Sequence, residues 1–175
     1  LALIAGLLCN DGELRRVADG TVELLGDPTE TALLQAAHLA GLDVEGLRSS
    51  IPRIDERPFD STRERMSTIH APVAGVSVDL AALPQDRTIS FVKGAPDAVL
   101  VRCAPMADAQ ETLKAMASRG LRVLAVATRP ATDIPVDAQA DDAEVELELL
   151  VLLGFEDPPR PSVADAIGAC RAAGI

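Results

Sequence analysis

The N-terminal part of the chain carries two apolar patterns that predict helices. The opening run LALIAGLLC, over residues 1–9, is almost wholly apolar and is typical of a buried helix. It is too short to span a bilayer, which takes about 20 residues. Residues 26–41, GDPTETALLQAAHLAG, have apolar positions at the spacing of one helical face. These positions are Leu33, Leu34, Ala37 and Ala40.

The second of these helices has clear start and stop signals. Asp27 can cap it, Pro28 suits its first position, and Glu30 stands where a capping box has its acidic residue. Gly41 ends the pattern. We therefore expect the carboxylates of Asp27 and Glu30 to lie together at one helix end.

Strand patterns follow in the middle of the chain. Four segments are rich in β-branched residues and predict strands: 51–60, 64–70, 73–80 and 88–92. Their links are short and contain turn residues, which favours antiparallel pairing. A weak hairpin is expected earlier, around Gly20.

The second half returns to mixed patterns. Residues 96–103 and 108–119 predict two helices, and residues 121–129 a continuous apolar strand. A polar, acidic loop is expected over 130–142, and residues 143–155 predict a strand that starts half-exposed and becomes buried. A last helix starts near Ser162 or Asp157. The predicted fold class is α+β: a mostly antiparallel twisted sheet flanked by helices.

Charge and composition narrow the function classes. The net charge of -11 argues against binding to nucleic acid or to an anionic membrane surface, although a few local cations can still hold a small anion. Three separated cysteines predict reduced thiols. The chain has no metal-ligand spacing, phosphate loop or G-x-G-x-x-G turn, so it offers no complete active site and no metal site.

For four residues the sequence allows two alternative roles each. Phe59 is one of only three phenylalanines and lies in a polar stretch, so it is either a core residue or an aromatic platform for a base. Lys93 ends an apolar strand, either in solvent or facing an anion. Arg122, in an apolar strand, needs either an acidic neighbour or a ligand. Glu30 either completes the capping box or serves a ligand.

Five stretches in a fixed order resemble one known family. They are GDPTETALL, PFDSTRERMS, FVKGAPDAVL, GLRVLAVATR and GFEDPPRPSV. Together they are similar to the nucleotide-binding domain of P-type cation-transporting ATPases, in particular the type II group that contains the calcium and sodium/potassium pumps. The resemblance extends over the whole chain and is weakest over residues 11–21 and 130–142.

The resemblance implies an ATP pocket and a role for each of its residues. Phe59 would stack on the adenine ring, and Glu30 would accept a hydrogen bond from the adenine amino group, with Asp27 nearby. Lys93 would lie along the adenine and α-phosphate side, where Gly94 lets the backbone approach the ligand. Arg122 would reach the β- and γ-phosphates.

The sequence departs from the family pattern beside this pocket. Glu64 stands where the family usually has a basic residue, and Ser61 occupies a position that is basic in some relatives. Arg63 and Arg65 remain, but we do not expect both of them to reach the pocket. ATP affinity is therefore expected to be modest and carried mainly by the adenine end.

The resemblance also implies a domain organisation and a role. Residues 1–156 would form the nucleotide-binding domain, and residues 157–175 the hinge and first helix of the phosphorylation domain. The parent protein would be an ATP-driven cation pump that uses Mg²⁺, with this part on the cytoplasmic side of the membrane. Its partners would be ATP or ADP and the phosphorylation and actuator domains of the same protein.

The printed sequence itself lacks the phosphorylated aspartate of the family. No Asp is followed by Lys, so we expect the chain to bind ATP as a monomer without hydrolysing it. The missing nucleophile disfavours a stand-alone enzyme. The alternative is a degenerate domain that serves as a regulatory or interaction module without significant nucleotide binding, which Glu64 and the net charge favour.

Overall fold

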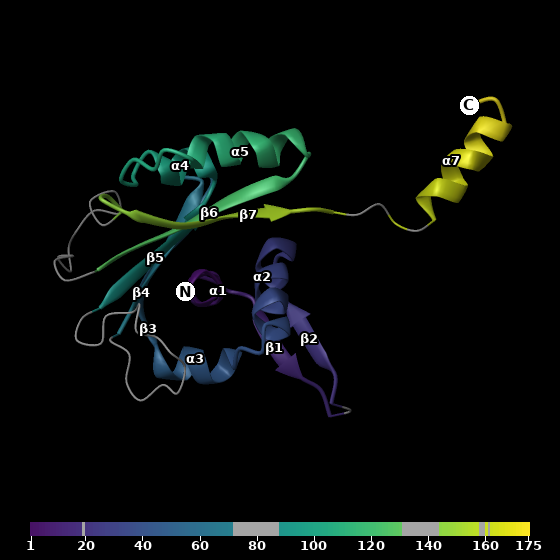
Figure 1. Ribbon diagram of the computed structural model, residues 1–175. Helices are drawn as coiled ribbons and strands as arrows, with labels where there is room; N and C mark the ends of the chain where they lie inside the picture. The colour runs from purple at the N-terminus through teal and green to yellow at the C-terminus, as the bar shows by residue number, and fades with distance from the viewer. Residues whose placement is uncertain (19, 72–87, 131–143, 158–159, 161) are drawn as a thin grey trace.

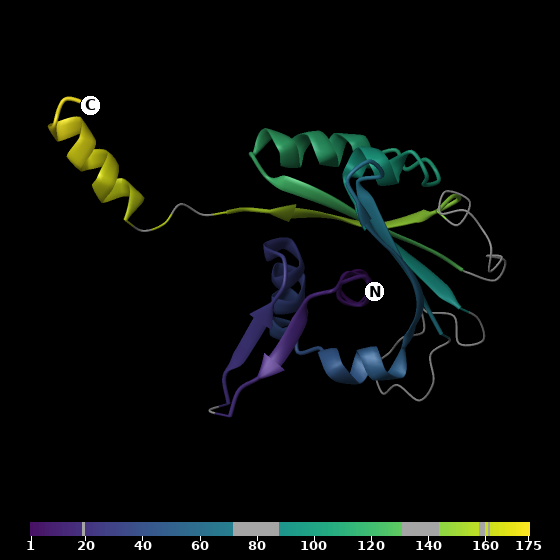
Figure 2. The same cartoon turned by 180° about the vertical axis from the view of Figure 1, so that it is seen from behind.

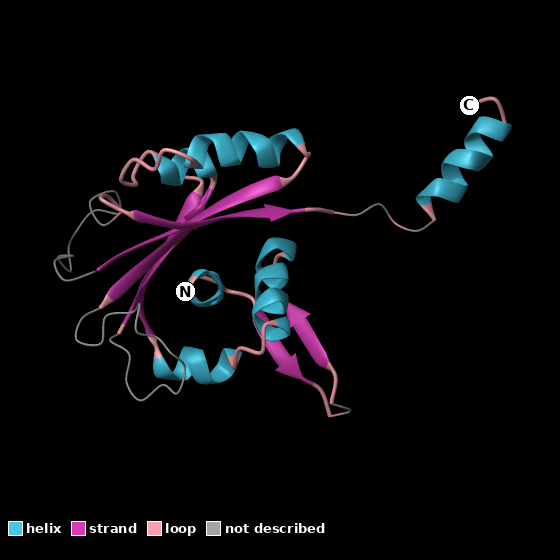
Figure 3. Cartoon of the chain, in the orientation of Figure 1, coloured by secondary structure: helices cyan, strands magenta, loops and turns pink. Residues whose placement is uncertain are grey.

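The fold is built on one five-stranded antiparallel sheet with the strand order β3-β4-β5-β6-β7 (Figures 1 and 3). The computed structural model describes residues 1–18, 20–71, 88–130, 144–157, 160 and 162–175. Every neighbouring pair in the sheet is antiparallel, as the sequence predicts. The five strands are β3 (Arg53–Asp60), β4 (Arg65–His70), β5 (Ile89–Gly94), β6 (Arg122–Pro130) and β7 (Glu148–Phe155).

Helices cover both faces of this sheet. Figures 1 and 2 show α4 and α5 on one face and α1, α2 and α3 on the other. A small antiparallel hairpin, β1 (Glu13–Arg16) and β2 (Val22–Leu25), lies beside α2 and contains Gly20 in its turn. The helices are α1 (Ala2–Leu8), α2 (Pro28–Leu39), α3 (Val44–Ser50), α4 (Pro96–Leu100), α5 (Ala109–Ser118) and α7 (Val163–Ala172).

The alternation of side chains along β5 separates two cores. Phe91 is fully buried against α1, α2 and α3, together with Leu7, Leu34 and Val126. Val92 points the other way and packs with residues of α4 and the neighbouring strands. Lys93 is two residues after Phe91, so it lies on the same face as the first core, near the end of β5.

The helix α7 stands apart from these cores. Every residue of α7 is exposed, and Figures 1 and 2 draw it away from the sheet. Among the described residues, no helix has both the length and the apolar character needed to cross a bilayer. The packed part of the described chain therefore ends with β7.

Most predicted elements are confirmed, with shifted ends. The helix predicted over 96–103 stops at Leu100, and the strand predicted from residue 143 begins at Glu148. The strand predicted over 73–80 lies outside the described residues, as does nearly all of the loop predicted over 130–142.

The sequence analysis missed helix α3. The side chain of Asp43 caps this helix by accepting a hydrogen bond from the amide of Gly46 (3.1 Å). Val44 and Leu47 are buried at helical spacing, so the signal was present. It was too short to stand out, because a seven-residue helix provides barely two turns of periodicity.

Two buried side chains beside the first core are uncharged. Burial raises the pKa of the Cys9 thiol to about 11, and all three cysteines are free, as expected. His70 is also buried, and burial lowers its pKa to about 4, with a smaller contribution from the charge of Arg53. Its Nδ1 faces the carbonyl of Ile51 (3.1 Å), so Nδ1 carries the proton, and Nε2 accepts from the hydroxyl of Thr68 (2.9 Å).

The neutral state of His70 makes stability depend on pH. Its pKa is lower in the folded chain, about 4, than the reference value of 6.5, so the unfolded chain binds the extra proton first as pH falls. The contribution of His70 to stability is fully present above pH 6.5 and is lost as pH falls towards 4, by roughly 2–3 kcal/mol. Urea unfolding across this range measures the loss. His70→Gln should flatten the curve in this window, and an unchanged slope in that variant would contradict the assignment.

Candidate functional site

The residues singled out from the sequence meet in one pocket of about 290 Å³. It lies where the first turn of α2 faces the ends of β5 and β6 and the exposed end of β3. The six predicted residues all line it: Asp27, Glu30, Phe59, Lys93, Gly94 and Arg122. Four further residues complete the lining: Asp11, Thr29, Met66 and Leu124.

The start of α2 supplies two of the acidic groups. The carboxylate of Asp27 caps the helix by accepting from the amide of Thr29 (2.8 Å), as predicted. This hydrogen bond holds the pKa of Asp27 below its usual value, and the positive charge of Arg122 contributes to the same effect. Asp27 and Arg122 therefore interact electrostatically at the pocket although they come from distant parts of the chain.

The centre of the pocket is an ion pair between strand and helix. Lys93 Nζ lies 3.0 Å from Glu30 Oε1, and the side chains of the two residues are only 7% and 17% exposed. The same Glu30 oxygen also accepts from the backbone amide of Asp11 (3.3 Å). Two interpretations of Glu30 were open: it completes the capping box, or it serves a ligand in a pocket. These contacts favour the second, because the carboxylate faces Lys93 in the pocket. They also exclude the interpretation that Lys93 ends its strand in solvent, because its ammonium group is buried against Glu30.

Phe59 contributes an exposed aromatic ring to the lining of the pocket. Its side chain is 62% exposed, so it is not a core residue that closes the sheet edge. It lies near the end of β3, one of the two outer strands of the sheet, and within the described part of the chain no other strand pairs with the outer edge of β3. A phenyl ring held in this way presents a free surface on which a flat ring can stack.

Gly94 has a structural reason to be glycine in addition to the predicted one. A Cβ at this position would lie 2.7 Å from Arg65 Cα and 2.5 Å from Arg65 Cβ, and would also meet the carbonyl oxygen of Glu64. Real Cβ contacts do not come this close. The absence of a side chain therefore lets strands β4 and β5 approach each other directly beside the pocket.

Neither of the two arginines next to Glu64 lines the pocket. Arg63 and Arg65 both form ion pairs with Glu144, and Arg65 and Glu144 are almost completely buried. Glu64 itself is exposed in the turn between β3 and β4 and has a positive φ of 53°. The cations of this turn are thus engaged with a buried carboxylate.

Four residues of the pocket lining were not predicted from the sequence, and their sequence signals differ in strength. Met66 and Leu124 could have been found from strand register, because Met66 pairs directly with Lys93, and Leu124 has the same parity in β6 as Val126, the other partner of Lys93. Asp11 gave no signal, since it reaches the pocket through its position in a loop. Thr29 follows from its place in the first turn of α2.

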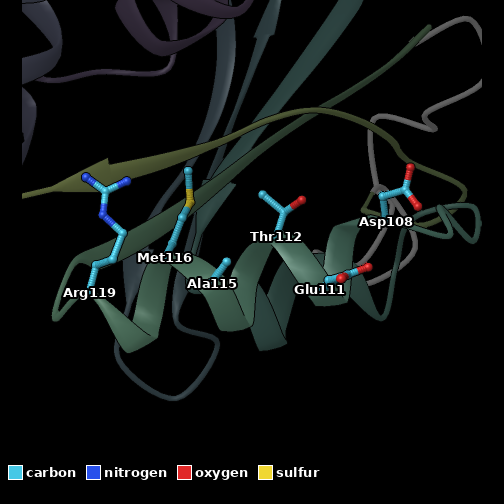
Figure 4. Close-up of a pocket in the computed structure, with 6 residues that line it drawn as sticks. All are labelled: Asp108, Glu111, Thr112, Ala115, Met116 and Arg119. Atoms are coloured by element: carbon cyan, nitrogen blue, oxygen red, sulfur yellow. The ribbon is translucent and has the colours of Figure 1, made fainter.

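A second hollow, along helix α5, has no comparable chemistry. Figure 4 shows that its lining follows one helix and its two flanking residues. The six residues are Asp108, Glu111, Thr112, Ala115, Met116 and Arg119. No group of three His, Cys, Asp or Glu residues in the described ranges could hold a metal ion. The pocket at Lys93 is the candidate site because all six residues predicted from the sequence line it.

Comparison with known proteins gives one consistent family. The family model for the cytoplasmic domain N of P-type ATPases matches residues 2–162. The chain is 37% identical to the cation-transporting ATPase pma1 of Synechocystis sp. over 99% of its own length and 19% of that protein. It is also 37% identical to a calcium-transporting ATPase of Bacillus subtilis, over 99% of the chain and 20% of the relative. The chain thus spans about a fifth of the length of these relatives. It belongs to the family of cytoplasmic N domains of P-type cation ATPases.

Proposed function

We propose that this chain is the ATP-binding domain of a cation-transporting P-type ATPase. The observation that carries the proposal is the convergence of Phe59, Glu30, Lys93 and Arg122 on one pocket from four different elements. The pocket combines an exposed aromatic ring, a carboxylate acceptor and two cations, which is the set of groups that an adenine ring and a polyphosphate require.

The dimensions of the pocket suit the adenosine end of the nucleotide. A volume of about 290 Å³ is at the lower limit of ligand pockets, which run from about 300 to 1,000 Å³. Phe59 would stack on the base, while Glu30 would accept from its amino group. Arg122, exposed at the mouth, would meet the phosphates that extend outside.

The existing ion pair limits the affinity for ATP. Lys93 and Glu30 already neutralise each other, so a phosphate has to compete with a carboxylate for the ammonium. The pocket lining carries three carboxylates, of Asp11, Asp27 and Glu30, against the two cations. The net field at the pocket therefore gives a polyphosphate little attraction, and the base contacts carry most of the binding.

In the intact protein, this domain would hold ATP for transfer to an aspartate on a separate phosphorylation domain. Catalysis would then depend on positioning and charge stabilisation by both domains. Residues 1–156 would form the nucleotide-binding domain on the cytoplasmic side, and residues 157–175 the hinge and first helix of the next domain. By itself the chain would bind ATP as a monomer without hydrolysing it.

One observation favours a second candidate, a regulatory or interaction domain with a weakened nucleotide site. Three basic side chains near the pocket are already paired, Lys93 with Glu30 and both Arg63 and Arg65 with Glu144. Glu64 adds a negative charge in the same turn. Binding of a partner protein without any response to millimolar ATP would support this candidate over the first.

Loss of the aromatic ring should weaken ATP binding strongly. Stacking of a base on an aromatic side chain contributes about 1–3 kcal/mol, so Phe59→Ala should raise the Kd for ATP roughly 5- to 150-fold. Isothermal titration calorimetry measures this change. Ile54→Ala is the matched control, because Ile54 is an exposed apolar residue of the same strand outside the pocket lining. Equal effects of the two substitutions would contradict a stacking role for Phe59.

Replacing Glu64 with a basic residue should strengthen the binding of the ATP phosphates but not that of the base. Glu64→Lys changes the local charge by two units at an exposed turn, and we expect a gain in ATP affinity of roughly 2- to 5-fold at low salt. The gain should shrink at high ionic strength, because exposed charges are screened. Adenosine, which has no phosphates, should bind both forms equally. A gain for adenosine as well would show that the substitution acts through the fold.

A further inference from the structure

The loop of residues 10–12, between α1 and β1, carries Asp11, which belongs to the lining of two hollows. Asp11 lines the nucleotide pocket. It also lines another hollow of about 390 Å³, distinct from the one along α5, together with Arg48 and Arg53. A displacement of Asp11 would therefore alter the lining of the pocket that contains Glu30.

This loop holds Glu30 at two points. The backbone amide of Asp11 donates to Glu30 Oε1 (3.3 Å), which is the oxygen that also faces Lys93. The side chain of Asn10 donates from Nδ2 to the backbone carbonyl of Glu30 (3.0 Å). Both the carboxylate and the main chain of Glu30 thus depend on where the loop lies.

Arg53 holds the loop from the opposite side. Its Nη1 donates to Asp11 Oδ1 (2.7 Å), and its Nη2 donates to the carbonyls of Asn10 (2.8 Å) and Leu8 (3.1 Å). Nη1 also meets Glu56 Oε2 at 2.5 Å, which fixes the guanidinium within its own strand. The planar, forked guanidinium can satisfy all of these acceptors at once.

Arg53 and Phe59 are also parts of the same strand, β3. At one end of this strand, Arg53 contacts the loop that holds Glu30, and near the other end lies the exposed ring of Phe59. We propose that Arg53 is a positioning residue of the nucleotide site, which fixes Glu30 through the Asp11 loop and so sets the preference for adenine. This inference rests on the function proposed above, although Arg53 itself is not among the residues that line the pocket.

Arg48 contacts the same loop but has a different role. Its Nη2 donates to the carbonyls of Leu7 (3.4 Å), Asn10 (3.1 Å) and Gly12 (3.0 Å), so it fixes the path of the main chain. The charged contact to the carboxylate of Asp11 belongs to Arg53. Arg53 is therefore the residue to change.

The test compares ATP with GTP in the Arg53→Lys variant. Lysine keeps the charge but cannot bridge the carboxylate and two carbonyls. Adenine presents an amino group where guanine has an oxygen, so a displaced Glu30 should weaken ATP binding alone. We expect the ratio of the Kd values for GTP and ATP to fall roughly 3- to 10-fold, which corresponds to the loss of about one net hydrogen bond. Calorimetric titration of both nucleotides measures the ratio.

Two further variants separate positioning from general damage. Arg129→Lys is the matched control, because Arg129 also donates to a backbone carbonyl, that of Val145 (2.8 Å), away from the pocket; it should leave the ratio unchanged. Asp11→Asn should lower the ratio in the same direction. The effect of the double variant with Arg53→Lys should be smaller than the product of the two single effects, because both substitutions weaken the same contact. Multiplicative effects, or an unchanged ratio in folded Arg53→Lys, would overturn the proposal.

A measurement without nucleotide distinguishes failure of this inference from failure of the proposed function. The amide of Asp11 is hydrogen-bonded to Glu30, so its hydrogen exchange reports whether the loop is held in place. Exchange should accelerate at least several-fold in Arg53→Lys. If the unchanged protein binds no ATP but this acceleration occurs, the proposed function fails and the positioning by Arg53 remains. If Arg53→Lys does not fold, the same exchange measurement on Asp11→Asn decides, and an unchanged rate overturns the inference.

Discussion

The ammonium group of Lys93 has to be neutralised inside the fold, and this requirement organises the site. A buried charge costs several kcal/mol unless a partner of opposite charge compensates it. The alternation of β5 directs Lys93 to the face covered by α1 and α2, where the partner is Glu30 in the first turn of α2. The same carboxylate offsets the positive end of the helix dipole, which would otherwise repel the lysine. The ion pair therefore ties α2 to the sheet at the position where the pocket opens.

Much of the fold and part of the site could be predicted from local patterns. The cap at Asp27, the strand that carries Lys93 near its end and the apolar strand that begins at Arg122 are each encoded within a few residues. The resemblance then supplied what local patterns could not, namely that Phe59 and Glu30 would meet Lys93. All of these residues line one pocket, although their distances along the chain gave no sign of it.

The features of the site that could not be predicted depend on contacts between residues that are distant in sequence. Arg63 and Arg65 meet Glu144 across about eighty positions, and no periodicity links those residues. The role of Asp11 arises from its backbone amide, which every residue except proline has, so the residue type carried no information. The close contact between Gly94 and β4, which leaves no room for a side chain in that direction, arises from the pairing of two strands that are distant in sequence. Such effects arise from packing in three dimensions.

Helix α7 is fully exposed, so its stability cannot come from packing against the described sheet or its covering helices. The helix has ten residues and none of them is buried. Isolated helices shorter than about 12–15 residues are marginal in water, because nucleation is costly and too few bonds follow. Its apolar residues Val163 and Ile167 are exposed without contributing to either core. The folding equilibrium of this segment is therefore separate from that of the sheet, and its helicity measures how well a neighbouring surface covers it.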